Sequence, residues 1–260
     1  MPERISVVMP ARNEIESFRE GAFINRVFEH TQGTEATVVV AVNNSKPEFV
    51  DLMDEMGRNM PNLQVLQLGQ LHPKTFAYAY LEGLNHAIQD GADKVIEMDA
   101  TGAHDPKYIP AFVGSLNEHG AALSSRFSPG GGIDRYPLQR KAISYGGTLA
   151  ANLYLGLGGH YPDLTSGYEA FRREVLGDIF CKVPINSWIS VNRGPGHFYQ
   201  VEMRAYTIWG GNDIGIIPMK WGTDRVKNPN LLPWQTVTKA LMDLHLLKKR
   251  RDNVKDDGKK

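Results

Sequence analysis

The sequence predicts an α/β fold with a mostly parallel central sheet and helices on both faces. Short apolar runs rich in β-branched residues alternate with amphipathic stretches over about the first 125 residues. The runs are apolar at consecutive positions, which is typical of strands buried on both faces. Polar clusters follow three of these runs, as expected where parallel strands end at a ligand-binding edge.

The elements are predicted in chain order from these patterns. Residues 5–10 (ISVVMP) form a β-branched run that ends at a proline, so we expect a strand. Residues 13–30 carry apolar side chains at helical spacing, so we expect an amphipathic helix. The later elements are expected as strands at 36–42, 63–68, 94–98, 121–126 and 214–219, and as helices at 49–60, 75–89, 105–116, 136–157 and 233–247.

Composition and charge narrow the function classes. The chain has 29 Lys+Arg and 29 Asp+Glu, so no overall charge draws it to nucleic acid or acidic membranes. The lone cysteine, Cys181, cannot form an internal disulfide, which favours a reducing, cytoplasmic setting. No signal peptide is evident, and no apolar run approaches the roughly 18 residues of a membrane span. We therefore expect a soluble protein, or one held peripherally at a membrane.

The polar clusters at the strand ends are the candidate functional residues. Parallel strands end at the same edge of a sheet, so clusters that follow different strands can converge on one crevice. The three clusters are Arg12-Asn13-Glu14, Asn43-Asn44-Ser45 and Asp99-Ala100-Thr101.

Three segments resemble a known family. ISVVMPARNE at 5–14 looks like the opening strand and turn of family-2 glycosyltransferases. MDATGAHDPKYIP at 98–110 is similar to a segment of the polyprenol-phosphate mannose synthases, and 125–176 resembles their middle region closely. The likeness covers most of residues 5–228. It implies a glycosyltransferase-A (Rossmann-like) fold, a nucleoside-diphosphate sugar donor, inversion at the anomeric carbon and a polyprenyl phosphate acceptor.

The residue patterns and the extent of the resemblance together indicate the domain organisation. We expect a single catalytic domain over 1–228, with a nucleotide-sugar half at about 1–126 and an acceptor half at about 127–228. A C-terminal amphipathic helix is expected at 229–247, and a charged, disordered tail at 248–260. The helix and the basic start of the tail could rest on an anionic membrane; packing on the domain is the alternative.

The donor side departs from the family pattern. Asn43-Asn44-Ser45 stands where the family has Asp-Asp-Gly-Ser, and Asp99-Ala100-Thr101 stands where it has Asp-x-Asp. Asp99 is thus the remaining carboxylate for a ribose or for Mg²⁺ or Mn²⁺, and both metal use and the choice of a GDP- or UDP-sugar stay open. The predicted donor contacts are Pro10, Arg12, Glu14, Asn43, Asn44, Asp99, Ala100, Thr101, Arg225 and Lys227.

Acceptor and catalytic roles follow from the same resemblance. Arg126, Arg140 and Ser144 match the family's acceptor-side phosphate contacts, and guanidinium groups suit phosphate. Ser166 is assigned to the same side. The catalytic candidates are Asp99, Arg126, Glu202 and Asp163. A hydroxyl acceptor would need a general base, for which Glu202 comes first. Asp163 could instead orient the Thr165-Ser166-Gly167 turn.

Two other functions remain open. The acceptor could be a soluble hydroxyl, such as a hydroxymethylated DNA base. The contacts to DNA phosphates would then come from the basic tail and from Arg135, Lys141, Arg172 and Arg173. The loss of an aspartate at Thr101 also allows a catalytically degenerate protein that binds sugar nucleotides without transferring them. Salt-sensitive DNA binding would favour the first, and transfer that depends on Asp99 would exclude the second.

Overall fold

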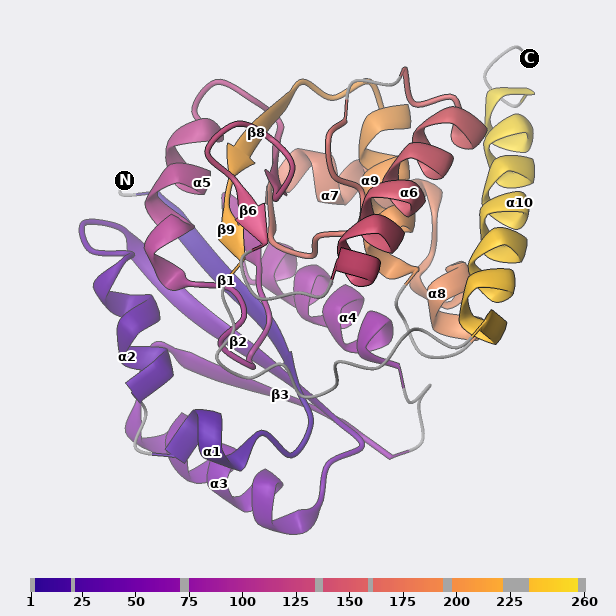
Figure 1. Cartoon of the computed structure of the whole chain (residues 1–260). Coiled ribbons are helices and arrows are strands. Elements are labelled where there is room, and N and C mark those ends of the chain that lie inside the picture. The colour runs from indigo at the N-terminus through magenta and orange to yellow at the C-terminus, as the bar shows by residue number, and fades with distance from the viewer. Residues whose placement is uncertain are drawn as a thin grey trace.

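The computed structural model describes residues 3–19, 22–70, 75–133, 138–158, 161–193, 198–221 and 234–256. These residues include a seven-stranded sheet in the order β3-β2-β1-β4-β7-β5-β8 (Figure 1). Its strands are β1 (Arg4–Ala11), β2 (Glu35–Asn43), β3 (Leu63–Gly69), β4 (Lys94–Glu97), β5 (Ala121–Ser125), β7 (Glu169–Arg172) and β8 (Ile214–Pro218). A separate two-stranded sheet pairs β6 (Gly132–Ile133) with β9 (Lys220–Trp221).

Helices cover both faces of the large sheet. One face packs against α1 (Ile15–Phe18), α2 (Ala22–Glu29), α3 (Pro47–Asn59) and α5 (Ile109–Ser115), which is preceded by a 3₁₀ turn at Pro106–Tyr108. The other face packs against α4 (Phe76–Gln89), α7 (Arg173–Lys182), α8 (Ile189–Asn192) and α9 (Tyr199–Trp209). α6 (Leu138–Leu155) and α10 (Trp234–Asp256) lie side by side outside this second layer (Figure 1). The predicted α/β class is confirmed.

The central strands are apolar at successive positions because they are buried on both faces of the sheet, as predicted. In β1, Val7 belongs to the hydrophobic core on one face of the sheet and Val8 to the core on the other, and both are fully buried. Val38 and Val39 of β2 divide in the same way. Because each successive side chain enters a core, these strands lack the apolar-polar alternation of half-exposed strands.

β7 is the strand of the large sheet that the sequence patterns miss, and they also miss the helices α7, α8 and α9. It lies between β4 and β5 and runs antiparallel to both, whereas β1 pairs in parallel with both β2 and β4, and β5 in parallel with β8. The sheet is therefore mostly parallel, as predicted. β7 and β8 come from the expected acceptor half of the chain, so both halves contribute to one sheet.

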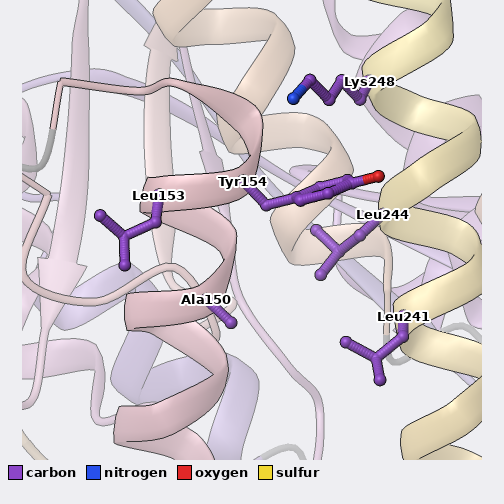
Figure 2. Close-up of a pocket in the computed structure, with 6 residues that line it drawn as sticks. All are labelled: Ala150, Leu153, Tyr154, Leu241, Leu244 and Lys248. Atoms are coloured by element: carbon purple, nitrogen blue, oxygen red, sulfur yellow. The ribbon is translucent and has the colours of Figure 1, made fainter.

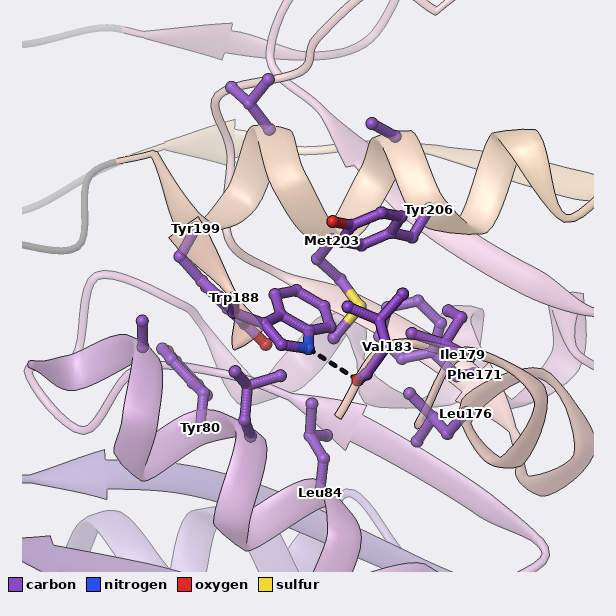
Figure 3. Packing of buried hydrophobic residues seen from close by; sticks show 14 of the residues in the cluster. Tyr80, Leu84, Phe171, Leu176, Ile179, Val183, Trp188, Tyr199, Met203 and Tyr206 are labelled. Atoms are coloured by element: carbon purple, nitrogen blue, oxygen red, sulfur yellow. Dashed lines mark hydrogen bonds between the residues drawn. The ribbon is translucent and has the colours of Figure 1, made fainter. Parts of the chain in front are cut away.

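Trp188 is the centre of the core on the α4 side. It is fully buried, and its indole Nε1 donates a hydrogen bond to the Val183 carbonyl over 3.1 Å (Figure 3). Its ring lies 6.1 Å from the ring of Tyr199, which stacks in turn on Tyr80 at 5.3 Å. These contacts join α4, α8 and α9 into one layer.

The predicted C-terminal boundary is wrong. α10 continues through Asp256, so the expected disordered tail at 248–260 is helical as far as 256, and residues 257–260 lie outside the described chain. Two of its basic side chains, Lys248 and Arg251, contact α6. Lys248 Nζ lies 4.6 Å from the ring centroid of Tyr154, and Arg251 donates to the Leu155 carbonyl over 2.6 Å. These contacts with the end of α6 stabilise the C-terminal part of α10.

The predicted helix at 13–30 is also wrong in part. α1 ends after Phe18, because the backbone at Arg19 turns extended with ψ 133°, and α2 begins at Ala22. Among the helices in the described ranges, none combines the length and apolar character that crossing a membrane requires.

Candidate active site

The predicted polar strand ends lie along one edge of the sheet. β1, β2 and β4 are neighbouring parallel strands, so their carboxyl ends point in one direction. Asn13 follows β1, and its Oδ1 accepts a hydrogen bond from the backbone N–H of Lys46, which follows β2, over 2.7 Å. Asp99 follows β4, beside β1 in the sheet. The donor-side candidates are therefore brought together.

Two asparagines at this edge have left-handed backbone conformations. Asn13 has φ 62° and Asn44 has φ 52°, and among the described non-glycine residues these are the ones with positive φ. Asparagine tolerates this region better than most residues, yet the conformation still carries strain, and such positions cluster at functional sites. The strained backbone thus marks the same edge that the sequence singled out.

The asparagine pair presents an unused acceptor. Asn44 Nδ2 donates to Asn43 Oδ1 over 2.7 Å, and Asn43 Nδ2 donates to the Thr75 carbonyl over 3.2 Å. Asn44 Oδ1 is buried and has no hydrogen-bond partner among the described residues. A buried acceptor without a partner is costly unless a ligand supplies the donor. The amide oxygen of Asn44 could accept from a ribose hydroxyl or a base N–H.

The other predicted donor contacts from β1 and β4 differ in what they can offer. The side chain of Glu14 folds back so that its Oε2 accepts a hydrogen bond from the backbone N–H of Arg12. The side chain of Arg12 is exposed. Pro10 is part of β1 and half-buried. Ala100 is buried in the core, so its backbone is the part that a donor could contact. Thr101 is exposed beside Asp99.

Asp99 is held in place by His104. The backbone N–H of Asp99 donates to His104 Nδ1 over 2.8 Å, and Asp99 Oδ1 accepts from the backbone N–H of Thr101 over 3.1 Å. Burial lowers the pKa of His104, and although the charge of Asp99 opposes this, the net shift is downward. A neutral ring that accepts at Nδ1 carries its proton on Nε2, which lies 3.9 Å from Asp99 Oδ2. His104 therefore fixes the backbone of Asp99 and places a ring N–H near its carboxylate.

The residues around Asp99 fit a divalent cation only in part. Mg²⁺ and Mn²⁺ prefer carboxylate and other oxygen ligands, and Asp99 supplies the carboxylate here. His104 Nε2 carries a proton in the arrangement above and is then no ligand. Within the described ranges, no group of three or more His, Cys, Asp or Glu side chains could hold a metal. A cation would thus need oxygens from a bound diphosphate or water in addition to Asp99.

Asp105 has the capping role that the sequence also allowed. Its Oδ1 accepts from the backbone N–H of Lys107 over 3.2 Å, at the start of the 3₁₀ turn, and it forms an ion pair with Arg26 at 2.9 Å. Hydrogen bonds and the charges of Lys107 and Arg26 outweigh burial and hold the pKa of Asp105 below its ordinary value.

Arg126 and Asp163 form a buried ion pair at the end of β5. Arg126 Nε and Nη2 donate to the two carboxylate oxygens of Asp163 over 2.7 and 2.9 Å. Asp163 also accepts from the backbone N–H of Thr165 over 3.0 Å, so it orients the turn as the alternative prediction had it. Burial raises the pKa of Asp163, but Arg126 outweighs burial and the net pKa is lowered. Asp163 is thus an ionised partner of Arg126.

Aromatic rings connect Arg126 to Asp99. The guanidinium carbon of Arg126 lies 5.5 Å from the ring centroid of Trp221. That indole meets the His104 ring edge-on at 4.9 Å, and His104 contacts Asp99 as described. Arg126 is 6% exposed, so it acts as a fixed positive charge at the margin of the site, with little surface open to a ligand.

The remaining acceptor-side predictions are only partly described. Ser166 is fully buried and its hydroxyl lies 2.6 Å from that of Ser124, so its side chain faces the interior. Ser144 is half-buried on α6. Arg140 is on the same helix, but its side chain lies outside the described residues, as do Arg225 and Lys227 entirely.

Glu202 has structural contacts. It is fully buried on α9, and its two carboxylate oxygens accept from the backbone N–H groups of Ile189 and Ser190 over 2.9 Å each. Arg250 of α10 lies 3.6 Å from Glu202. Burial raises the pKa of Glu202 despite these bonds. The contacts link α9 to α8 and α10, and they leave no carboxylate face toward an acceptor.

A buried cluster behind the site escaped the sequence interpretation. Glu97 and Glu169 are cross-strand partners on β4 and β7, and both are fully buried. Glu169 pairs with the fully buried Arg204 at 2.9 Å, and the Tyr199 hydroxyl donates to Glu97 over 2.7 Å. Glu97 Oε1 and Glu169 Oε2 have no partner among the described residues. Burial, and then the charge of Glu169, raises the pKa of Glu97 well above its usual value. We therefore assign Glu97 as the protonated member of the pair.

Glu97→Gln is expected to flatten the dependence of stability on pH. Unfolded glutamate ionises near pH 4.5, whereas buried Glu97 keeps its proton, so stability falls as pH rises from 4.5 toward the raised pKa. Glutamine mimics the protonated acid, so the variant should gain on the parent by up to about 1.4 kcal/mol per pH unit in that window. Urea unfolding across pH measures this. Exposed Glu48→Gln is the control, and a Glu97→Gln profile parallel to the parent profile would contradict the assignment.

Comparison with known proteins adds a family match. The model of the family "Glycosyl transferase family 2" matches residues 6–180. An undecaprenyl-phosphate mannosyltransferase from Micrococcus luteus is 28% identical over 217 residues, which are 83% of this chain and 82% of that protein. A polyprenol monophosphomannose synthase from Mycolicibacterium smegmatis is 26% identical over 241 residues, 92% and 84% of the two chains.

Solved structures agree on the fold. Glucosyl-3-phosphoglycerate synthase from Mycobacterium tuberculosis, crystallised with Mn²⁺, UDP and glucosyl-3-phosphoglycerate, superposes with a TM-score of 0.60. The match covers 96% of this chain and 80% of that one at 16% sequence identity. At that identity the likeness concerns the fold alone, and it confirms the glycosyltransferase-A architecture predicted from the resemblance.

Proposed function

Because the chain belongs to glycosyl transferase family 2, we propose that it transfers a mannose-like hexose from a nucleoside-diphosphate sugar to a polyprenyl phosphate, with inversion. Two relatives named for that kind of acceptor, aligned over most of both chains, support the proposal. The observation that carries the proposal is that both candidate bases, Asp163 and Glu202, already bind partners within the protein. Asp163 is held by Arg126, and Glu202 caps α8.

The lack of a free base among these candidates favours a phosphate acceptor. A hydroxyl must lose a proton when it attacks the anomeric carbon, whereas a phosphate oxygen already carries negative charge. In the proposed step, an acceptor phosphate oxygen forms the bond to the anomeric carbon as the bond to the donor diphosphate breaks. No proton has to move. This argument counts against a hydroxymethylated DNA base as the acceptor.

The donor would lie along the edge formed by β1, β2 and β4. Asn44 Oδ1 would accept from the nucleoside, and Glu14 and Asn43 would line the same part of the site. Asp99 would bind the ribose, or a Mg²⁺ or Mn²⁺ ion together with the diphosphate; such an ion would neutralise charge on the leaving group. Arg126 would add positive charge on the acceptor side, as Arg225 and Lys227 would for the diphosphate.

Donor binding and transfer can be measured separately. A nucleotide sugar that binds only the folded chain should raise its melting temperature, by the equivalent of about 2.7 kcal/mol at a hundredfold excess over Kd. GDP, UDP, GDP-mannose and UDP-glucose, each with and without Mn²⁺, form the panel. The stabilising sugar nucleotide, carrying a radiolabelled sugar, is then offered to a polyprenyl phosphate in detergent. We expect label in the lipid phase.

Three outcomes would overturn the proposal. Stabilisation by a sugar nucleotide without transfer to any acceptor would favour the degenerate binder. Transfer to hydroxymethylated DNA but not to the polyprenyl phosphate would favour the hydroxyl acceptor. A lipid product with the anomeric configuration of the donor retained would exclude the single inverting step.

A further inference from the structure

Large exposed apolar side chains gather on one pair of helices. In the part of the chain that the structure describes, every large hydrophobic side chain classed as exposed comes from α6 or α10. Leu153 is 72% exposed and Met242 is 60% exposed. We call this surface the α6–α10 face; its exposed apolar residues are Leu138, Tyr145, Leu149, Leu153, Tyr154, Leu241 and Met242. A concentration of this kind marks an interaction surface, whereas scattered apolar residues do not.

The two helices enclose a groove. The Tyr154 hydroxyl lies 2.7 Å from His245 Nδ1, which joins α6 to α10 at the surface. Beside this contact is a groove of about 580 Å³ (Figure 2). Its lining is apolar except for the polar ends of Tyr154 and Lys248: Ala150, Leu153, Tyr154, Leu241, Leu244 and Lys248.

Basic residues outnumber acidic residues on the two helices. α6 contains no acidic residue, whereas α10 contains Asp243 and, in its last turns, Asp252 and Asp256. Asp243 is buried and paired with Arg193 at 2.6 Å. Lys248 and Lys249 are exposed. A chain with zero formal net charge thus presents an apolar face with a basic rim.

The face begins at the acceptor side of the candidate site. Tyr145, on the exposed side of α6, packs edge-on against Phe127 at 5.6 Å, and Phe127 follows Arg126 in the chain. Ser144, a predicted acceptor contact, is the residue before Tyr145. A molecule resting on the α6–α10 face therefore lies beside the proposed acceptor site.

We propose that the α6–α10 face docks on the surface of a lipid bilayer that contains anionic lipids. Leucine and methionine side chains would enter the boundary of the acyl chains, tyrosines would lie at headgroup level, and the lysines would attract anionic headgroups. The inference rests on the proposed function, because a bilayer would present a polyprenyl phosphate next to Arg126. The excess of basic residues on the two helices and the exposed tyrosines favour lipid over a protein partner.

Vesicle co-sedimentation tests this proposal without measuring transfer. The full chain is mixed with vesicles of phosphatidylcholine alone, or of phosphatidylcholine and phosphatidylglycerol in equal parts. We expect binding to the mixed vesicles that weakens with salt. Leu149→Glu with Leu153→Glu should lower the partition coefficient at least about tenfold, because two charges enter the contact. Lys182→Glu on α7 changes net charge by the same two units elsewhere and should retain most of the binding.

Other outcomes would overturn the docking proposal. These are an absence of binding by the parent chain, equal loss in Lys182→Glu, or a solution dimer that the double substitution dissociates, which would make the face a self-association surface. Unchanged melting temperatures confirm that the variants fold. Transfer to polyprenyl phosphate in detergent separates this proposal from the proposed function: the double variant should keep that transfer. A chain that binds vesicles but transfers no sugar would contradict the function alone.

Discussion

Replacing Arg204 with methionine is expected to lower the free energy of unfolding by about 3–5 kcal/mol, because it leaves a buried carboxylate without its partner. Arg204 is fully buried and pairs with Glu169 at 2.9 Å. It also donates to the carbonyls of Ser124 and Asp163, which belong to the end of β5 and to the turn that orients Arg126. Chemical unfolding, followed by circular dichroism, measures the loss.

A second substitution separates the unpaired charge from other causes. Glu169→Gln in the Arg204→Met background removes the stranded carboxylate, so it should restore a large part of the lost stability. Arg26→Met is the matched control: its ion pair with Asp105 is half exposed, and we expect a loss below about 1 kcal/mol. A loss at Arg204 no larger than at Arg26, or no recovery in the double variant, would show that the cluster does not depend on this pairing.

The cluster around Arg204 also shows where prediction from the sequence fails. The buried strands β1 and β2 could be predicted because both contain consecutive apolar residues, many of them β-branched. β7 could not be predicted, because its four residues include Glu169 and because it is antiparallel to both neighbouring strands. A glutamate within a strand is tolerated only because Arg204, from a helix distant in the sequence, neutralises it. Local patterns contain no information about such a partner.

In the candidate site, too, some features could be predicted from the sequence and others could not. Its donor-side positions were predictable, because the ends of parallel strands converge whatever the rest of the chain does. The roles of single side chains were not. Glu202 reads as a free carboxylate until α8 supplies two backbone donors, and Lys248 and Arg251 read as a solvated tail until Tyr154 and Leu155 face them. Each of these roles depends on a tertiary partner.

Asp99→Asn is expected to lower kcat by about 10²–10³-fold, the range seen when one preorganised electrostatic contact to a transition state is removed. Asparagine keeps the shape of Asp99 and can still accept the Thr101 backbone N–H, but it carries no charge for a cation or for a ribose hydroxyl. Because Asp99 is partly exposed and its hydrogen bonds survive, stability should change by less than about 1 kcal/mol. Transfer assays at saturating donor measure the first effect, and thermal unfolding measures the second.

Asp105→Asn is the matched control, with the same chemical change six residues further along the chain. Asparagine is as good a helix cap as aspartate, so this variant should stay within a few-fold of the parent rate. A full rate in Asp99→Asn would remove Asp99 from catalysis, and an equal fall in both variants would point to general electrostatics. If Asp99 binds the cation, the part of the donor-induced stabilisation that depends on Mn²⁺ should vanish in Asp99→Asn and persist in Asp105→Asn. If Asp99 contacts the ribose instead, donor binding should weaken equally with and without Mn²⁺.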